Sequence, residues 1–380
     1  LHYPLRRQRQ MCIRDRMNNE NSGVNKEVGS GITIMGYAGI TNQDVAPHSI
    51  DIFHETSIQQ IQVNLATKAC PITTNITAVN ATPVVAPVAN YTIPISTPFA
   101  LTGSATDANP GDVLTYCWEQ DDNGSAATTG NASVASPGKS TGPNWLTFNS
   151  STNPVRTCPI LPTILAGNFI TPTLPGGDPI ANIEALSSVG RNLKFRLTVR
   201  DNSPYSSTAP VKVGQTAFTD MTVTVTNTSG PFGVSQPNTA VSWQALTTQT
   251  VTWTVANTTN APVSCSNVNI LLSTDGGFTF PVTLVANTAN DGTEDVILPN
   301  TPTTTARIKV ESVGNIFFDI CNANFTILAP PTGFTFDSPA AANLTCAGAP
   351  SAAITLGTAA QGGFSTPINL TSAGNPAGTT

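Results

Sequence analysis

Residues 192–202 read NLKFRLTVRDN, and every second residue from Leu193 to Val199 is apolar. A period of two is typical of a β-strand with one face in the core and the other in water. The same alternation recurs in two neighbouring stretches: Leu114, Tyr116 and Trp118, and Met221, Val223 and Val225. We therefore expect residues 91–228 to form a β-sandwich, with an insertion rich in Gly, Pro, Asn and Ser over about 121–190.

A second set of alternating runs predicts another sandwich over residues 229–329. These runs are Val251–Val255, Val268–Leu272 and Ile308–Val310. Residues 330–380 are too few to close a further sandwich of this kind, so they are interpreted as a truncated third β module. Charged residues make up only 10% of the chain and aromatic residues 6%, which favours short strands and many turns. The expected fold is mainly β.

The charge of the chain excludes some classes of partner. Its formal net charge is −6 and no basic stripe is present, which argues against a nucleic-acid partner. No apolar run reaches the roughly 20 residues that a transmembrane helix needs, so we expect no transmembrane segment. Residues 1–16, LHYPLRRQRQMCIRDR, hold five of the 16 Lys and Arg residues and have no hydrophobic period. They resemble a translated sequencing adapter and are interpreted as a non-native tail; a basic tail for an acidic partner is the alternative.

One substantial helix is expected, from a cap at Ser49 to about Lys68. Five apolar residues recur at helical spacing and would form its buried stripe: Ile50, Phe53, Ile58, Ile61 and Leu65. His54 is then expected on the solvated flank of the helix. Residues 69–90, ACPITTNITAVNATPVVAPVAN, are predicted to be an extended linker that holds the following module away from the preceding one.

The stretch SGITIMGY, residues 30–37, has a different character. Residues 32–34 are β-prone, and Gly36 directly after Met35 permits a sharp reversal because Gly tolerates positive φ. An ordinary strand end with a buried Met is one interpretation of this pattern. The other is a turn that holds a flexible thioether against a site above it.

The segments TIMGYAGI and NQDVAPHSIDIFHETSIQQI resemble the Met-turn and C-terminal helix of reprolysin-like zinc metallopeptidases of the metzincin group. In that group a helix carrying HExxHxxGxxH supplies three zinc-binding His and a general-base Glu. The resemblance implies that residues 17–68 are the end of a catalytic domain. It also implies that Met35 lies beneath the metal and that Tyr37 helps to stabilise the transition state.

The chain departs from this family in its zinc ligands. It has three His residues in all and no HExxH, since His54-Glu55 is followed by Thr56, Ser57 and Ile58. Catalytic zinc needs three protein ligands and an open position. We therefore expect a fragment that lacks its zinc helix and has no proteolytic activity by itself.

The blocks FALTGSATDA, LTYCWEQDD, NPVRTCPILPTIL and NLKFRLTVRDN resemble the immunoglobulin-like module that follows the peptidase domain in bacterial members of the family. The resemblance implies a secreted or extracellular protein, also compatible with a bacterial cell surface. Protein or peptide substrates are implied for the parent enzyme, and surface or matrix binding for the sandwich modules.

Cysteines and carboxylates provide three further candidate features. Cys117 with Cys158, and Cys265 with Cys321, fall within one expected domain each and are either disulfides or free thiols. Three carboxylates are candidate calcium ligands, the alternative being a solvated turn: Asp107, Asp112 and Asp201. Residues 273–280, STDGGFTF, nearly match the Asp-box S-x-D-x-G-x-T-W, which predicts a tight hairpin and, more weakly, a glycosidase.

Two functions remain open from the sequence. The leading one is a fragment of a secreted zinc metalloendopeptidase with accessory sandwiches. The alternative is a non-enzymatic surface adhesin or structural protein of tandem immunoglobulin-like domains, which the composition from residue 70 onward fits equally well.

Overall fold

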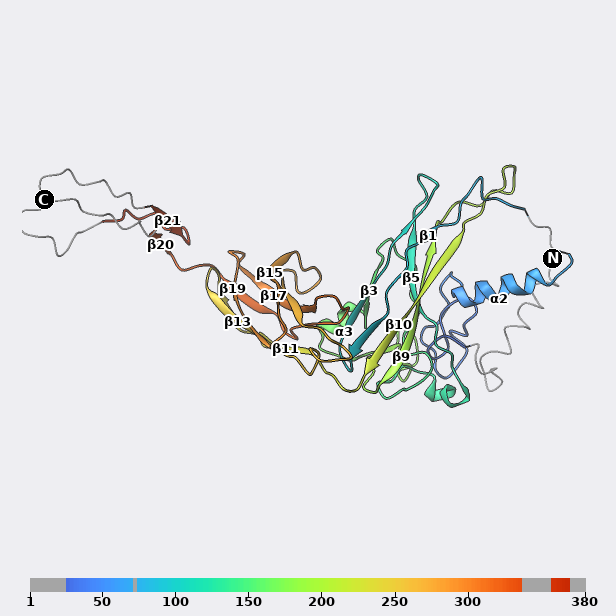
Figure 1. The fold of residues 1–380 in the computed structure, drawn as a ribbon, viewed down its shortest axis with the longest axis horizontal. Helices are drawn as coiled ribbons and strands as arrows, with labels where there is room; N and C mark the ends of the chain where they lie inside the picture. Colours follow the sequence, from blue (N-terminus) through green and yellow to red (C-terminus); the bar gives the residue numbers. More distant parts are fainter. Residues whose placement is uncertain (1–24, 71–73, 337–356, 370–380) are drawn as a thin grey trace, which may run out of the picture.

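The computed structural model describes residues 25–70, 74–336 and 357–369, so the predicted tail of residues 1–16 lies outside them. The chain is mainly β, as the alternation predicted. Two β-sandwiches follow each other along the long axis, and the segment before residue 70 packs on the first of them (Figure 1).

A four-stranded sheet is the main layer of the first sandwich, in the order β2-β10-β9-β5. Its strands are β2 (Tyr91–Pro94), β10 (Thr216–Thr226), β9 (Arg191–Arg200) and β5 (Thr115–Gln120). The first and last of these in sequence, β2 and β10, pair in parallel. Three short antiparallel pairs complete the sandwich: β1 (Val84–Val85) with β4 (Ala105–Thr106), β3 (Phe99–Thr102) with β6 (Val155–Cys158), and β7 (Ile170–Thr171) with β8 (Glu184–Ala185).

Strand β9 shows both the strength and the limit of the period-two pattern. Leu193, Phe195, Leu197 and Val199 are buried in the core, as predicted. On the other face, which was expected to be wet, Arg196 and Thr198 are buried as well. They are covered because the N-terminal segment lies across this face of the sheet, which no local pattern could reveal.

The second sandwich has two sheets. One has the order β11-β13-β16, and the other β12-β19-β17-β14-β15 with β18 on β17. The strands of the first sheet are β11 (Gly233–Gln236), β13 (Thr248–Thr254) and β16 (Thr293–Ile297). Those of the second are β12 (Ser242–Gln244), β14 (Asn267–Ser273), β15 (Val282–Ala289), β17 (Thr303–Ser312), β18 (Phe318–Ile320) and β19 (Phe325–Leu328). Here too the outer strand β12 pairs in parallel with the last strand, β19.

The two sandwiches share one continuous hydrophobic core. On the second sandwich's side of the junction the rings of Phe232 and Phe317 meet edge to face, with centroids 5.1 Å apart. The backbone N–H of Phe318 donates to the carbonyl of Pro98 at 2.9 Å, and the N–H of Phe232 to the hydroxyl of Thr97 at 3.0 Å. Backbone bonds and buried rings therefore hold the sandwiches in one orientation.

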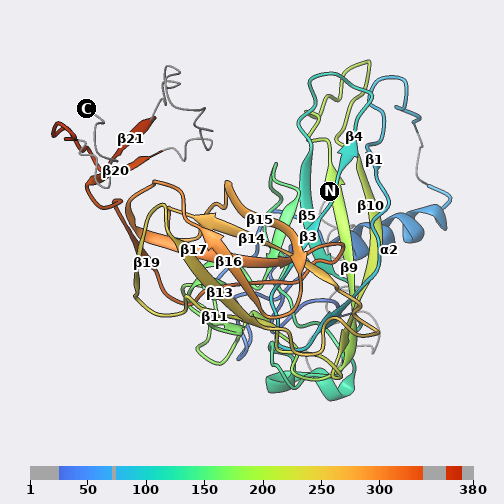
Figure 2. The ribbon, with the colours of Figure 1, turned by 60° about the vertical axis from the view of Figure 1, so that its left-hand side comes forward.

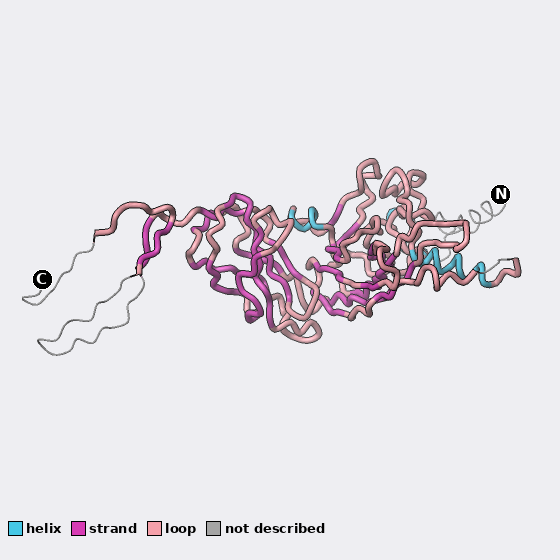
Figure 3. Tube along the Cα trace, turned by 90° about the horizontal axis from the view of Figure 1, so that it is seen from above, coloured by secondary structure: helices cyan, strands magenta, loops and turns pink. Residues whose placement is uncertain are grey.

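The short helix α3 (Leu161–Leu165) lies at the same junction (Figure 3). It comes from the insertion of the first sandwich, and its Ile164 packs with Phe318 and Ile320 of the second. The guanidinium of Arg307 donates to the carbonyl of Leu165 at 3.2 Å. Part of the predicted loop insertion thus connects the two units.

Helix α2 runs over Glu55–Ala66, so the predicted start at Ser49 is wrong. The preceding residues pair with the Met-turn stretch instead: the N–H of Ile50 donates to Ile32 O at 2.8 Å, and that of Ile34 to Ile52 O at 3.0 Å. Ile50 therefore does not belong to a helical stripe. Leu65 within the helix is 48% exposed, so the predicted apolar face is only partly covered.

The segment 69–90 does not act as a spacer. Strand β1 within it pairs with β4, and Asn80 is fully buried in the first sandwich. The preceding segment contacts the same sandwich, with Gly29 N donating to Ser133 O at 3.1 Å and Arg200 to Phe53 O at 2.8 Å. Proline content therefore does not predict how this segment packs.

A further antiparallel pair of strands, β20 (Gly333–Phe336) and β21 (Thr358–Gln361), follows the second sandwich. Among the described helices, none is both long and apolar enough to cross a bilayer.

Candidate functional site

The Met-turn stretch forms a tight double turn. Gly36 N donates to Thr33 O at 2.6 Å, and Tyr37 N to Ser30 O at 2.8 Å. A Cβ on Gly36 would lie 2.8 Å from Thr33 O and 2.9 Å from the carbonyl carbon of Gly31. The predicted reversal after Met35 is therefore present, but Gly36 is required for space and not for a positive φ.

A buried carboxylate organises this turn. Glu27 Oε1 accepts hydrogen bonds from the N–H groups of Ile32 and Thr33, both at 3.0 Å, and its Oε2 accepts from the Thr33 hydroxyl at 2.7 Å. The sequence analysis does not single out Glu27, which lies in the polar stretch NKEVG, residues 25–29. A single acidic residue in a polar stretch carries no signal of such a role.

Met35 and Tyr37 are both half-buried. Two His residues lie in the described part of the chain. His48 is exposed, whereas His54 is buried with its Nε2 3.2 Å from Gln120 O. No three His, Cys, Asp or Glu side chains among the described residues converge to hold a metal ion. The roles of Met35 and Tyr37 near a zinc ion stay predictions.

The prediction that His54 lies on a solvated flank is wrong. His54 is buried and caps helix α2. Its backbone is extended and its Nδ1 accepts the N–H of Thr56 at 3.2 Å. The ring lies between the helix and strand β5, where it contacts Gln120. His54 is not one of the usual N-cap residues Ser, Thr, Asp or Asn, so residue preference favours Ser49 as the start of the helix.

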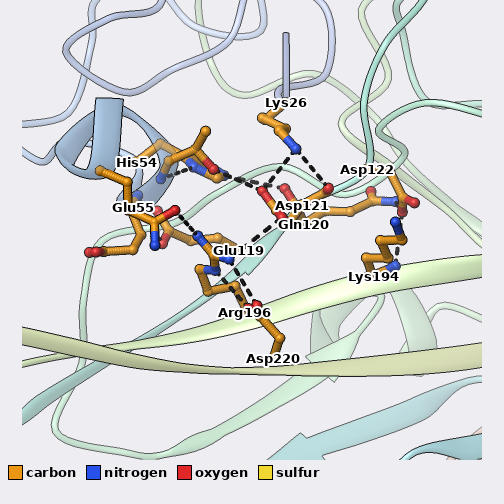
Figure 4. Close-up of polar contacts among 12 residues, drawn as sticks. Lys26, His54, Glu55, Glu119, Gln120, Asp121, Asp122, Lys194, Arg196 and Asp220 are labelled. Carbon is orange, nitrogen blue, oxygen red and sulfur yellow. Dashed lines mark hydrogen bonds and ion pairs between the residues drawn. The ribbon is translucent and has the colours of Figure 1, made fainter. Parts of the chain in front are cut away.

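A charged network joins α2 to the outer face of the first sandwich (Figure 4). Arg196 of β9 donates to both carboxylate oxygens of Asp220 on β10, at 2.7 and 2.8 Å. It also donates to Gln59 of α2 at 2.8 Å, and lies 3.7 Å from Asp121 Oδ2. A bidentate arginine of this kind fixes orientation as well as distance. Arg196 therefore ties the helix to two strands.

Asp121 connects the same helix to the segment before the Met-turn. Its Oδ1 accepts the Thr56 hydroxyl at 2.8 Å and lies 3.1 Å from Lys26 Nζ. Burial pushes the pKa of Asp121 up, but the charges of Lys26 and Arg196 and the Thr56 hydroxyl more than offset it, so the net shift is downward. Asp121 is thus a charged partner that holds three segments together.

Two glutamates beside this network are not fully satisfied. Glu119 Oε2 accepts the hydroxyl of Thr198 and, at 3.3 Å, the N–H of Glu55. Glu55 Oε2 and Glu119 Oε1 are buried and accept no hydrogen bond from any described residue. Burial, and then the nearby charge of Glu119, raise the pKa of Glu55 to about 7. Both carboxyl groups lie in the contact between helix α2 and the sheet, so their protonation state affects how the helix packs on the sheet.

The two predicted disulfides are absent from the described residues. The four cysteines that would form them are free: Cys117, Cys158, Cys265 and Cys321. Cys117 lies opposite Thr198 in the main sheet, whereas Cys158 lies opposite Phe99 in the other layer. Their sulfurs make separate contacts, such as Cys117 Sγ to Phe148 O at 3.2 Å.

The second predicted bridge is absent as well. Cys265 Sγ contacts Asn267 O at 3.2 Å, and Cys321 Sγ contacts Ala323 O at 3.4 Å. Burial raises the pKa of Cys321 to about 11, which leaves an unreactive thiol at neutral pH. Burial raises the pKa of Cys117 and Cys158 as well.

The three candidate calcium ligands do not act as one set. Asp201 is enclosed, and its Oδ1 accepts the N–H groups of Ser203 at 3.0 Å and Gln215 at 2.9 Å. Its Oδ2 accepts Asn80 Nδ2 at 2.6 Å. Asp107 Oδ1 accepts Asn109 N at 2.7 Å, which is the bend that the solvated-turn alternative predicted. Asn80 was missed because it lies in the stretch assigned as a linker.

The Asp-box match forms a capped hairpin between β14 and β15. Asp275 Oδ1 accepts the N–H groups of Phe278 and Thr279, both at 3.0 Å, and its Oδ2 accepts the Thr279 hydroxyl at 2.6 Å. Ser273 donates to Oδ1 at 2.6 Å and accepts the N–H of Gly277 at 2.8 Å. The tight hairpin is confirmed.

Replacing Asp275 by asparagine is expected to lower the free energy of unfolding by about 1–2 kcal/mol, because the Oδ2 acceptor for Thr279 is lost. Urea unfolding at pH 7 measures this. The hydrogen bond from Ser273, then those from Thr279, lower the pKa of Asp275, so its contribution is present above its ordinary value of 3.8 and is lost only at more acidic pH. Asp51→Asn, at an exposed carboxylate, is the control, and an equal loss in both variants would contradict the role of Asp275.

The fold therefore defines a mainly β protein built from tandem sandwiches, and its structural neighbours are of the immunoglobulin and fibronectin III kinds. No family model and no curated protein matches the chain. The fibronectin(III)-like modules of Clostridium thermocellum CbhA match at 12% identity and a TM-score of 0.21, covering 65% of this chain and 94% of theirs. The tandem Ig repeats of Dlar match at 12% identity and a TM-score of 0.29, covering 64% and 96%. At these scores the likenesses carry no argument about activity or partners.

Proposed function

We propose that this chain is a non-catalytic tandem-sandwich protein that serves as a fixed arm for binding to a cell surface or extracellular matrix. The observation that supports this proposal is the continuous packing from the Met-turn segment to the second sandwich. Arg196 and Asp121 join the first segment to the first sandwich. The β-bridge between Phe99 and Phe317 and the hydrogen bond from Phe232 N to the Thr97 hydroxyl join the two sandwiches. Large buried contacts of this kind remove the hinge that would otherwise be expected between domains.

A fixed arm suits attachment to an extended partner, because two distant patches then meet the partner in one geometry. The second contact becomes intramolecular, with a high effective concentration. Chains of sandwiches joined by flexible linkers lose part of this advantage to the freedom of the linker. In this proposal the charged side chains of Arg196 and Asp121 serve to hold helix α2 on the first sandwich.

Retention on a surface tests the proposal. The labelled whole chain is incubated with washed cell walls and with films of matrix protein, with albumin-coated films as a control. We expect saturable retention that a metal chelator such as 1,10-phenanthroline leaves unchanged. Retention no greater than on albumin, on every surface tried, would overturn the proposed function.

A second candidate function, part of a reprolysin-like zinc metallopeptidase, is favoured by the Met-turn stretch. The double turn at Met35 and Gly36 is closed by two short backbone bonds and clamped by Glu27, as a turn beneath a metal would need to be. The resemblance would place Tyr37 beside the zinc, with the ligands on a separate helix. Sequencing the gene upstream of Val24 tests this, and an in-frame HExxHxxGxxH there would favour the peptidase.

The chain itself is expected not to cleave unfolded casein when zinc is added, because its His residues cannot supply three ligands. Gel electrophoresis of casein after prolonged incubation measures this, with thermolysin as the positive control. Cleavage that 1,10-phenanthroline stops, and that Tyr37→Phe weakens, would instead assign catalysis to this chain.

A further inference from the structure

Three loops meet at the end of the first sandwich that lies away from the Met-turn, the end at which Figure 2 shows β1 and β4 side by side. Ala81 N donates to Asn109 Oδ1 at 2.7 Å, and Asn109 Nδ2 to Val79 O at 3.2 Å. Asn80 Nδ2 donates to Val213 O at 3.0 Å. The loops around residues 80, 109 and 213 are thus held together by side-chain bonds.

Three buried oxygens in these loops accept no hydrogen bond from any described residue: Asn80 Oδ1, Asp107 Oδ2 and Asp112 Oδ2. Asn80 is only 1% exposed, so water in bulk does not reach its amide. Buried polar atoms are nearly always satisfied in native proteins. Three orphan acceptors in loops that are bonded to one another therefore point to a partner that is not a protein donor.

The orientation of Asn80 is set by its other bonds. Its Nδ2 uses both hydrogens, one for Asp201 Oδ2 at 2.6 Å and one for Val213 O at 3.0 Å. Because the amide is planar, its Oδ1 is directed away from these two acceptors. Asp201 in turn is fixed by the N–H groups of Ser203 and Gln215. Asp201 is a positioning residue for Asn80 and not a ligand.

The charge of the loops favours a cation. Asp107 and Asp112 belong to one turn, and Asn109 connects them, since it donates to Asp107 Oδ1 and accepts the N–H of Asp112 at 3.3 Å. The cation that faces them is Lys212, whose Nζ is 3.6 Å from Asp112 Oδ1, beyond hydrogen-bond length. Bends in the chain explain the bonded oxygen of Asp107 but leave the three orphan oxygens unexplained.

We propose that Asn80 Oδ1, Asp107 and Asp112 bind a calcium ion. Calcium takes six to eight oxygen ligands in flexible geometry, including amide and carboxylate oxygens, backbone carbonyls and water. The proposed ligand set has two carboxylates and one amide. The Asn80 amide takes the place of Asp201, the third carboxylate of the sequence prediction, and Asp201 accepts a hydrogen bond from that amide. The site does not depend on the proposed function, and it would fix the loops of this sandwich end.

Calorimetric titration of the whole chain with calcium chloride, after treatment with a chelator, tests the site. We expect a single site with a dissociation constant of about 10⁻⁴ to 10⁻³ M, as in extracellular modules, and weaker binding of magnesium. Calcium should also raise the melting temperature by several degrees when it is present at about 100 times the dissociation constant.

Variants separate this site from general acidity. Asp107→Asn and Asp112→Asn keep the side-chain shape and are each expected to weaken calcium binding at least about tenfold. Asn80→Ala should do the same, and Asp201→Asn should weaken it less because Asp201 only positions Asn80. Asp275→Asn, in the other sandwich, should leave binding unchanged. Absence of binding at about 10 mM calcium, well above the constants of such sites, or equal binding in Asp107→Asn, would overturn the proposal.

Discussion

Replacing Phe317 by alanine is expected to lower the free energy of unfolding by about 3–5 kcal/mol, the usual loss for a fully buried phenylalanine. Phe317 is 0% exposed and stacks edge to face on Phe232 at the junction of the sandwiches. It also lies in a β-bridge with Phe99 of the first sandwich. The bridge is a backbone contact and survives truncation, but the ring is lost from the hydrophobic core that the two units share, so the coupling between them should weaken together with their stability.

Differential scanning calorimetry measures both effects. The wild-type chain is expected to show one main transition for the two sandwiches, because their core is continuous. In Phe317→Ala this should separate into two transitions, as each sandwich then unfolds by itself. The matched control is Phe278→Ala, at a ring that is 65% exposed, with an expected change within about 0.5 kcal/mol. A single transition in Phe317→Ala, shifted no more than in the control, would contradict this account of the junction.

Alternation along the sequence was sufficient to predict where the strands of both sandwiches bury side chains. Leu193 to Val199, and Val268 to Leu272, are buried as expected, because a half-covered strand must place one set of alternate residues inside. It was not sufficient to predict the junction. Phe317 and Phe232 lie in irregular stretches, where the direction of a side chain depends on which other segment arrives.

The candidate site was predicted less well, and each failure has a physical reason. Ile50 and Ile52 pair with the Met-turn stretch, and this tertiary pairing overrides the helical spacing that predicted a start at Ser49. Cys117 and Cys158 fall in one domain but in different layers of it, and sequence separation cannot distinguish these arrangements. Asn80 has no charge and lies among prolines and threonines, so only the three-dimensional structure relates it to Asp107 and Asp201.

The stability of the chain is expected to fall as the pH rises from about 4.5 to about 7, because Glu55 at the start of α2 holds a proton in the folded state. Glu55 is 3% exposed, and its buried Oε2 accepts no hydrogen bond from any described residue. Burial and the charge of Glu119 raise its pKa from 4.5 to about 7, while Arg200, Arg196 and His54 lower it less. In this pH range the folded state binds more protons than the unfolded state, so the free energy of unfolding decreases with pH. The linkage limits the decrease to about 3 kcal/mol.

Glu55→Gln isolates this effect, since glutamine has the same shape and no charge. At pH 8 the variant is expected to be more stable than wild type by up to about 3 kcal/mol, less the roughly 0.3–1 kcal/mol that a carboxylate contributes near a helix N-terminus. At pH 4.5 the two should differ little. Asp319 has its pKa raised to about 7 by burial and is present in both proteins, so only the difference between them reports on Glu55.

Urea unfolding of both proteins at pH 4.5, 6 and 8 gives the three differences, with Asp51→Asn as a control whose difference from wild type should not depend on pH. Hydrogen exchange in residues 55–66 locates the effect, because deprotonated Glu55 destabilises the docked helix first. A gain in Glu55→Gln that is the same at all three pH values would mean that the substitution acts through packing. In that case ionisation of Glu55 beside Glu119 is not what destabilises the contact between helix and sheet.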